Sequence, residues 1–263
     1  MSKFVPITSE RHAAKRWQRY ATYDFAVQEA VASVILAELP KALISLPIAF
    51  IQQGGDFFPA ALLGLQPGKN LFVTPEGQWI GSYIPALLRG YPFRLAVVGE
   101  KQQKILCIDE DSGLITEGPA GEAFFNVDGT PAQPVTDMLN YFVRIEENRV
   151  LTAQACLILT KHRLIHRWVI PADAASGRKE VKGLFKIDEA ALNALPGDAL
   201  LELRKAGALL LAYCQLLSMQ HLPLLGKLAE AHAKIAAPPL PANGEIDLEF
   251  LNRSGTLRFG NLA

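Results

Sequence analysis

The residues best suited to molecular recognition gather in one segment of the chain, residues 62–97. Within it, Trp79 and Tyr83 offer aromatic rings, Arg89 offers a guanidinium and Asn70 offers an amide. Rings and guanidinium groups dominate the energetics of protein interfaces, and they also stack on carbohydrate or peptide ligands. We therefore predict that these four residues bind a ligand or a partner protein.

The same residues also have a purely structural interpretation. Arg89 lies among apolar and aromatic neighbours, so its charge needs a carboxylate or carbonyl partner. If Glu189 or Asp109 is that partner, the arginine forms an internal ion pair and the rings are ordinary core. The binding interpretation instead predicts a concave pocket in which Arg89 reaches solvent.

No group of residues combines the spacing and the charge of a metal site. His162 and His166 are four residues apart and would share one face of a helix, as zinc ligands do. Their neighbours are basic, and no carboxylate offsets the charge of an entering cation. The acidic run 109–113, with Glu117 after it, is too short for a calcium loop and fits an acidic turn. We predict no metal ion.

The chain lacks the motifs of the common enzyme classes. It contains no phosphate-binding loop, no dinucleotide fingerprint, no His-Glu-x-x-His and no Gly-x-Ser-x-Gly. The cysteines Cys107, Cys156 and Cys214 are dispersed among apolar residues, as buried reduced thiols are. We predict neither catalytic residues nor a cofactor. The missing motifs favour a protein that is not an enzyme, and an enzymatic function stays open.

Charge and hydropathy narrow the class of protein further. The 263 residues include 26 Lys and Arg and 26 Asp and Glu, and proteins that grip nucleic acid normally carry a basic surplus. We therefore predict no nucleic-acid partner. The apolar region 30–51 is interrupted by charges and prolines, so we predict no transmembrane segment. Because no secretory signal begins the chain, the expected location is the cytoplasm, with signal-independent export to the cell surface left open.

The first half of the chain has the pattern of short strands and tight turns. Residues 31–36 and 46–51 are predicted strands with a helical turn between them; the alternative is one amphipathic helix over 24–39. Two prolines favour the strands. Turn residues predict hairpins over 71–81 and 123–129, and two more strands, joined around Gly99, over the ranges 93–98 and 104–108.

From residue 134 the apolar period becomes helical. It predicts one helix around 135–143 and a second over 151–165, and then a strand over 181–187. Asp188 is placed to cap the brief helix that follows.

The last third carries the longest predicted helix, 199–219, which is apolar enough to be buried or pressed against a partner. A helix over 224–235 follows, then a proline-rich linker at 236–244. Residues 245–263 predict a C-terminal β-hairpin, which must dock on the main domain or on a partner subunit. The predicted fold is α+β: residues 1–235 form a single domain with a mixed, mainly antiparallel central sheet and helices packed on it.

The chain contains a set of short motifs, which occur in this order: Leu63-Gly64-Leu65, Asn70-Leu71-Phe72, Gly77-x-Trp79, Tyr83-Ile84-Pro85-Ala86, Arg89, Tyr91-Pro92-Phe93, Asp128-Gly129, Ile187-Asp188-Glu189 and Leu217-Ser218. Through these motifs the chain resembles the SapC-like family of bacterial proteins over nearly its whole length. This family is distinct from the similarly named peptide-transport permease, which has several membrane spans.

The resemblance implies a modest set of expectations. The family takes its name from bacterial surface-layer arrays, and it has no established catalytic residues to carry over. Members also occur beside genes for flavin-dependent tryptophan halogenases, cupin-like oxygenases and outer-membrane receptors. The resemblance favours a non-catalytic accessory or interaction protein that binds a partner protein or forms a homo-oligomer. The alternative is a small-molecule-binding protein or enzyme that acts alongside such oxygenases on an aromatic or peptide substrate.

Overall fold

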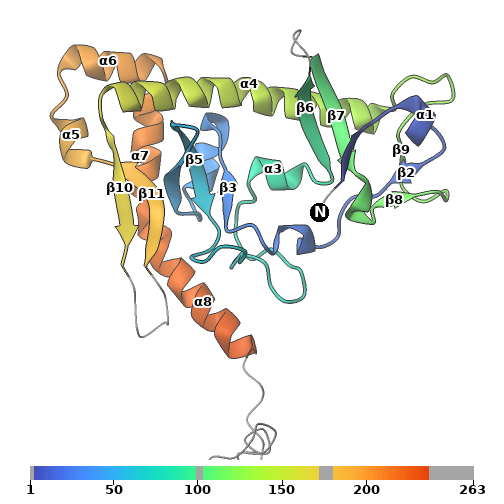
Figure 1. The fold of residues 1–263 in the computed structure, drawn as a ribbon, viewed down its shortest axis with the longest axis horizontal. Helices are drawn as coiled ribbons and strands as arrows, with labels where there is room; N and C mark the ends of the chain where they lie inside the picture. The colour runs from blue at the N-terminus through green and yellow to red at the C-terminus, as the bar shows by residue number, and fades with distance from the viewer. Residues whose placement is uncertain (1–2, 99–102, 172–179, 237–263) are drawn as a thin grey trace, which may run out of the picture.

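The computed structural model describes residues 3–98, 103–171 and 180–236. These ranges contain helices and antiparallel sheets, which confirms the predicted α+β class. The strands form three sheets rather than one central sheet, and each described pair is antiparallel. Figure 1 shows the long helix α4 lying across the top of the molecule, above the five-stranded sheet.

The largest sheet has five strands in the order β10-β11-β4-β5-β3. Its strands are β10 (Ile165–Ile170), β11 (Val181–Ile187), β4 (Ile48–Gln53), β5 (Asp56–Leu62) and β3 (Val31–Ser33). Between β3 and β4 lie the short helices η2 (Leu36–Glu38) and α2 (Leu39–Ala42). The predicted strand–turn–strand is therefore confirmed, and the alternative single helix is not formed.

Two smaller sheets occupy the other end of the molecule. One has the order β1-β7-β6 and the other β8-β2-β9. Their strands are β1 (Phe4–Pro6), β7 (Gln103–Asp109), β6 (Phe93–Val98), β8 (Ile115–Thr116), β2 (Arg16–Trp17) and β9 (Glu122–Ala123). Strands β6 and β7 confirm the predicted pair. The other two predicted hairpins are reduced to isolated bridges, Val73 to Trp79 and Phe125 to Pro131.

The prediction of two helices after residue 134 is wrong, because one helix, α4 (Gln133–Lys161), spans both. No glycine or proline interrupts residues 135–161, so an exposed polar stretch in the middle continues the helix instead of breaking it. An ion pair of 2.7 Å between Glu146 and Arg149 lies in that stretch. The chain then reverses at Arg163, whose φ of 54° is left-handed, and residue 165 begins β10 rather than ending a helix.

The predicted longest helix over 199–219 is also wrong, because it is divided into α6 (Gly197–Lys205) and α7 (Ala208–Ser218). The break is at Gly207, whose φ of 72° is a left-handed conformation that glycine adopts without steric cost. A Cβ atom built there would lie 3.3 Å from Leu36 Cδ1, so the site also has little spare room.

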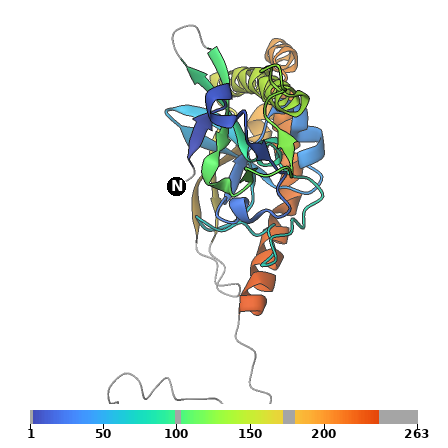
Figure 2. The ribbon, with the colours of Figure 1, turned by 90° about the vertical axis from the view of Figure 1, so that its right-hand side faces the viewer.

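The remaining helices are short, apart from the last. They are α1 (Ser9–His12), η1 (Asp24–Ala26), α3 (Ala86–Arg89), η3 (Glu110–Ser112), α5 (Glu189–Asn193), η4 (Met219–His221) and α8 (Leu222–Ala236). Asp188 caps α5 as predicted, since its Oδ1 accepts a hydrogen bond of 3.0 Å from Ala191 N. Figure 2 shows α8 projecting away from the body.

Two hydrophobic cores divide the described residues, and α4 contributes to both. The larger packs α4 and α7 on the five-stranded sheet, and the smaller joins α4 to β6, β7 and the N-terminal segment. The helical run Ala208–Ile235 is long and apolar enough to cross a membrane by length and composition alone. Core helices of soluble proteins pass the same test, and 39% of its most apolar stretch is buried here.

Ala236, the first residue of the predicted linker 236–244, ends α8, and the rest of that linker and the predicted hairpin 245–263 lie outside the described residues. The assignment of residues 1–235 to one domain stays a prediction.

A buried glutamine connects α7 to the middle of the large sheet. Strands β11 and β4 pair at only two positions, Leu184 with Ile51 and Phe185 with Phe50, and then separate. Beyond that point the fully buried Gln215 accepts a hydrogen bond of 2.9 Å from Ile187 N and donates one of 3.1 Å to Ile48 O. The side chain thus replaces the missing ladder bonds.

We expect Gln215→Met to lower the free energy of unfolding by roughly 2–5 kcal/mol, because it leaves a buried N–H and a buried carbonyl without partners at a similar side-chain volume. Urea unfolding measures this loss. Leu217→Gln, on the exposed face of the same helix, should change stability by about 0.5 kcal/mol or less. An equal effect of both substitutions would contradict the assigned role.

Candidate functional site

Two of the four predicted binding residues support the loop that carries the others. Asn70 is 2% exposed; its Nδ2 donates to Ala26 O at 3.0 Å and its Oδ1 accepts from Phe72 N at 2.9 Å. Trp79 stacks on Phe72 with ring centroids 5.5 Å apart, and its Nε1 donates to Tyr83 O at 3.1 Å. Both side chains hold the segment that leads to Tyr83.

Tyr83 and Arg89 meet at the surface beside α3. Arg89 is exposed; its Nη2 donates to the Tyr83 hydroxyl at 3.2 Å and its Nε donates to Ile84 O at 3.1 Å. The guanidinium carbon lies 5.5 Å from the centre of the Tyr83 ring and 5.9 Å from that of Tyr141. These contacts orient a cation between two aromatic rings while leaving it open to solvent.

The internal ion pair considered for Arg89 is not formed. Asp109 is buried in β7, where its carboxylate accepts from Lys3 N at 3.0 Å and from the Tyr91 hydroxyl at 3.3 Å. Glu189 begins α5, at the far end of the molecule from α3 in Figure 1. Within the described residues, Arg89 has no carboxylate partner in direct contact.

A buried glutamate lies behind this pair. Glu38 is 5% exposed and accepts three hydrogen bonds. Its Oε1 accepts from the Tyr83 hydroxyl at 3.1 Å and from Ala86 N at 3.0 Å, and its Oε2 accepts from Ile35 N at 3.3 Å. Glu38, Tyr83 and Arg89 therefore form a chain of contacts from the interior to the surface.

The protonation of this chain follows from burial. Burial raises the pKa of Glu38 above its ordinary value, and the hydrogen bonds from Ala86, Tyr83 and Ile35 only partly oppose this. Burial, followed by the nearby charge of Glu38, also raises the pKa of Tyr83. The Tyr83 phenol therefore keeps its proton at neutral pH and donates a hydrogen bond to Glu38. The phenol oxygen remains free to accept a hydrogen bond from Arg89.

A hollow of about 360 Å3 opens at this surface. It is lined by Ile35, Ala37, Glu38, Lys41, Tyr83, Ala86, Arg89, Tyr141, Arg144, Ile145 and Asn148. Its exposed charges are the cations Lys41, Arg89 and Arg144, while its one carboxylate is the buried Glu38. We call this hollow the cationic pocket.

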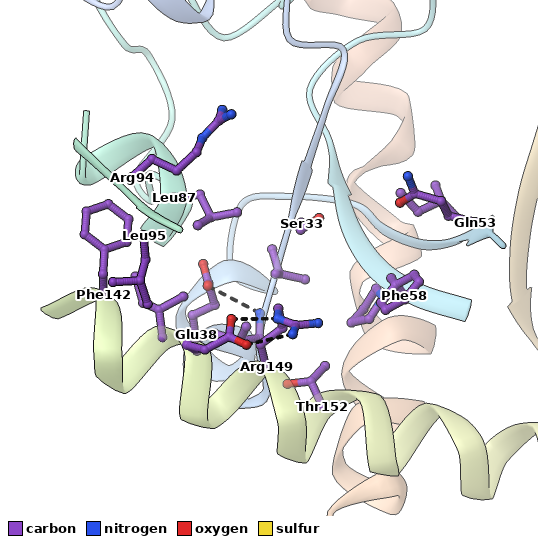
Figure 3. Close-up of a pocket in the computed structure, with 16 residues that line it drawn as sticks. Ser33, Glu38, Gln53, Phe58, Leu87, Arg94, Leu95, Phe142, Arg149 and Thr152 are labelled. Atoms are coloured by element: carbon purple, nitrogen blue, oxygen red, sulfur yellow. Dashed lines mark hydrogen bonds and ion pairs between the residues drawn. The ribbon is translucent and has the colours of Figure 1, made fainter. Parts of the chain in front are cut away.

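A second cavity, of about 280 Å3, also has Glu38 in its lining (Figure 3). It shares Ile35, Glu38 and Ile145 with the cationic pocket. Its walls are mainly apolar, and Figure 3 shows Phe142, Leu95 and Phe58 among the side chains that surround it. Glu38 thus lines two hollows, one mainly apolar and one rich in cations.

The other groups considered from the sequence remain apart. His162 follows the end of α4 and lies 2.9 Å from Glu202, whereas His166 belongs to β10 and lies 3.5 Å from Asp188. The two histidines therefore do not share a helix face. Among the described residues, no group of three metal-ligating side chains comes together. The three cysteines are buried and free.

Sequence reasoning missed four of the charged or aromatic residues that line the cationic pocket: Glu38, Lys41, Tyr141 and Arg144. Glu38 could have been noticed as a lone acid among apolar residues just before Pro40. Tyr141 and Arg144 lie in a helix whose periodicity indicates which side is apolar, but not what that side approaches.

Fold and pocket together define an α+β protein with a cation-rich, aromatic-lined hollow above a buried acid. The family model named SapC matches residues 7–225, and the chain belongs to this family. No curated protein and no solved structure matches the chain.

We expect Glu38 to make stability fall as pH rises. The pKa of Glu38 is higher in the folded state than in the unfolded state, where it is near 4.5. The contribution of Glu38 to the free energy of unfolding is therefore complete below the unfolded-state pKa and is lost as pH rises through the folded-state pKa. Glu38→Gln cannot ionise, so the difference in unfolding free energy between the variant and the wild type should change across this window and then level off.

Urea unfolding from about pH 4 to about pH 8 measures the effect. The matched control is Glu147→Gln, at an exposed position of α4, which should follow the wild-type profile. Parallel profiles of wild type and Glu38→Gln would contradict the assigned electrostatics.

Proposed function

We propose that this protein is a non-catalytic binding protein, and that its cationic pocket recognises an aromatic group that carries a carboxylate. The observation that supports this most directly is the state of Arg89. Its guanidinium is oriented by Tyr83 and Ile84 but has no bonded carboxylate among the described residues, and it is exposed. A carboxylate can accept from donors presented in this way with favourable geometry.

The remaining lining residues support the same ligand class. Lys41 and Arg144 add two exposed cations, and within the described ranges neither has an ion-pair partner at 4 Å or less. The rings of Tyr83 and Tyr141 offer surfaces on which a planar group can stack. An anionic group would meet the three cations, while its aromatic part would meet the rings.

The bonding of Glu38 supports recognition rather than catalysis. A general base needs a free acceptor position within hydrogen-bonding reach of the substrate. Glu38 is only 5% exposed, and its carboxylate already accepts three hydrogen bonds from two backbone N–H groups and one phenol, which leaves little of it in reach of a bound molecule. It therefore serves to position Tyr83, and through it Arg89.

The same ligand chemistry has two sources, a free aromatic acid or the C-terminal aromatic residue of a partner protein.

An interaction role, with a partner protein or a second copy of this chain, gains support from α7. Its Leu210, Tyr213 and Leu217 are 49%, 45% and 59% exposed and follow one another at helical spacing. The link to the surface layer rests on family membership alone.

We expect Arg89→Gln to weaken binding of 3-phenylpropionate by about tenfold or more, because a charge-assisted hydrogen bond is lost. Ligand-observed NMR or calorimetry measures the affinity. The uncharged 3-phenylpropionamide should bind the wild type weakly, and the exposed substitution Lys205→Gln should leave binding unchanged.

A parallel measurement with the peptide Gly-Gly-Phe, with a free or an amidated C-terminus, distinguishes the two sources. Preference for the free peptide over phenylpropionate assigns the pocket to a protein C-terminus. If acid and amide bind equally, or Arg89→Gln binds as the wild type does, the proposal is refuted.

A further inference from the structure

Two sheets end in edge strands that border one groove. Strand β3 is the outermost strand of the five-stranded sheet, and β6 is the outermost strand of the sheet β1-β7-β6. Within the described residues, β3 pairs only with β5 and β6 only with β7. Each therefore has one side of its backbone outside any sheet, and such an edge is a template for another strand.

The outward groups of β6 follow from its register. Asp109 N donates to Pro92 O at 2.9 Å, so these residues form a hydrogen-bonded pair across the β6–β7 ladder. Bonding alternates along antiparallel strands, so Arg94 also bonds to β7. The N–H and C=O groups of Leu95 and Val97 consequently turn away from β7, toward the open edge.

The same reasoning applies to β3. Val34 N donates to Pro59 O at 3.0 Å, which continues the β3–β5 register. Ala32 therefore bonds to β5, whereas the backbone groups of Val31 and Ser33 turn toward the open edge. Ser33 is exposed, so its outward N–H is within reach of a partner.

Cavities occupy the space between these edges. The 280 Å3 cavity has Ser33 on one side and Leu95 on the other, and Figure 3 shows Leu87 of α3 between them. A neighbouring hollow of about 290 Å3 has Val31 and Phe93 in its lining. The two hollows share Ser33, Leu87, Arg94 and Phe142, so they form successive parts of one groove along β3 and β6.

We propose that this groove binds an extended segment of a partner protein, whose backbone pairs with the open edges of β3 and β6. Alternate side chains of an extended segment point to opposite faces, so one set would pack on Leu87 and Phe142 at the base of the groove. Outward N–H and C=O groups on both sides fit a polypeptide backbone better than a small molecule.

Charge indicates the composition of the bound segment. Arg94 is exposed, lies 4.2 Å from the centre of the Phe4 ring, and has no ion-pair partner at 4 Å or less in the described part of the chain. Arg149, which lines the same cavity, is paired with Glu146 at 2.7 Å, and the exposed Glu29 lines the neighbouring hollow. Arg94 is therefore the cation of the groove that a bound acidic side chain can pair with. The groove therefore fits an extended segment in which apolar residues alternate with polar ones and an acidic side chain lies opposite Arg94. The groove shares Ile35, Glu38 and Ile145 with the cationic pocket, but this proposal does not rest on the function proposed for that pocket.

The test uses the full-length chain and a pool of synthetic nine-residue peptides in which Glu or Asp alternates with Val, Leu or Phe. We expect Ser33→Pro to weaken binding by about fivefold or more, because proline removes the outward N–H of β3. Ser33→Ala keeps that N–H and is the matched control, with affinity like that of the wild type. Peptides N-methylated at alternate residues should lose affinity on the wild-type protein.

Hydrogen exchange identifies the paired groups. Bound peptide should slow the exchange of the Val31, Ser33, Leu95 and Val97 amides, and Arg89→Gln should not alter this protection. The proposal is overturned if no peptide of the pool binds, or if Ser33→Pro and Ser33→Ala bind equally. It is also overturned if these amides are already protected without peptide, because then another part of this chain or a second copy fills the groove.

Discussion

One buried carboxylate determines how the segments around both hollows are arranged. Burying a charge or an unpaired polar group is costly unless hydrogen bonds compensate for lost water. Glu38 meets this requirement with donors from three places in the chain: Ile35 N, the Tyr83 hydroxyl and Ala86 N. The turn at η2, the loop that ends at Tyr83 and the first residue of α3 are therefore positioned by one side chain. Burial raises the pKa of Glu38 because these hydrogen bonds compensate only in part for the water that the carboxylate has lost.

This constraint extends outward to the surface. Since the Tyr83 hydroxyl donates to Glu38, its oxygen remains available to accept from Arg89, and the guanidinium is held by contacts that do not neutralise it. On the inner side, the same glutamate forms part of the wall of the apolar cavity. The charged pocket and the groove between β3 and β6 thus share a structural origin, although they differ in chemistry and present different groups to a partner.

The comparison of sequence with structure is most informative at two helices. Apolar spacing predicted two helices where α4 is continuous, because a solvent-facing polar stretch weakens the pattern without containing a residue that breaks a helix. The reverse error occurred at Gly207. An apolar run suggested one helix, but the chain takes a left-handed conformation there, and α6 and α7 are separate. Periodicity reports which face is buried, whereas helix ends depend on single backbone conformations.

The sequence by itself determined the α+β class, the short strands of the first half, the family and the presence of an aromatic and arginine-bearing segment, because these depend on local pattern and residue type. Only the tertiary structure decided that Arg89 is solvent-facing and held by Tyr83, and that Glu38 lies behind them. The Tyr83 and Ala86 donors are 45 and 48 residues from Glu38 in the chain. Such contacts are set by the packing of α3 and η2 beneath α4, and no local pattern specifies which acid a distant donor will meet.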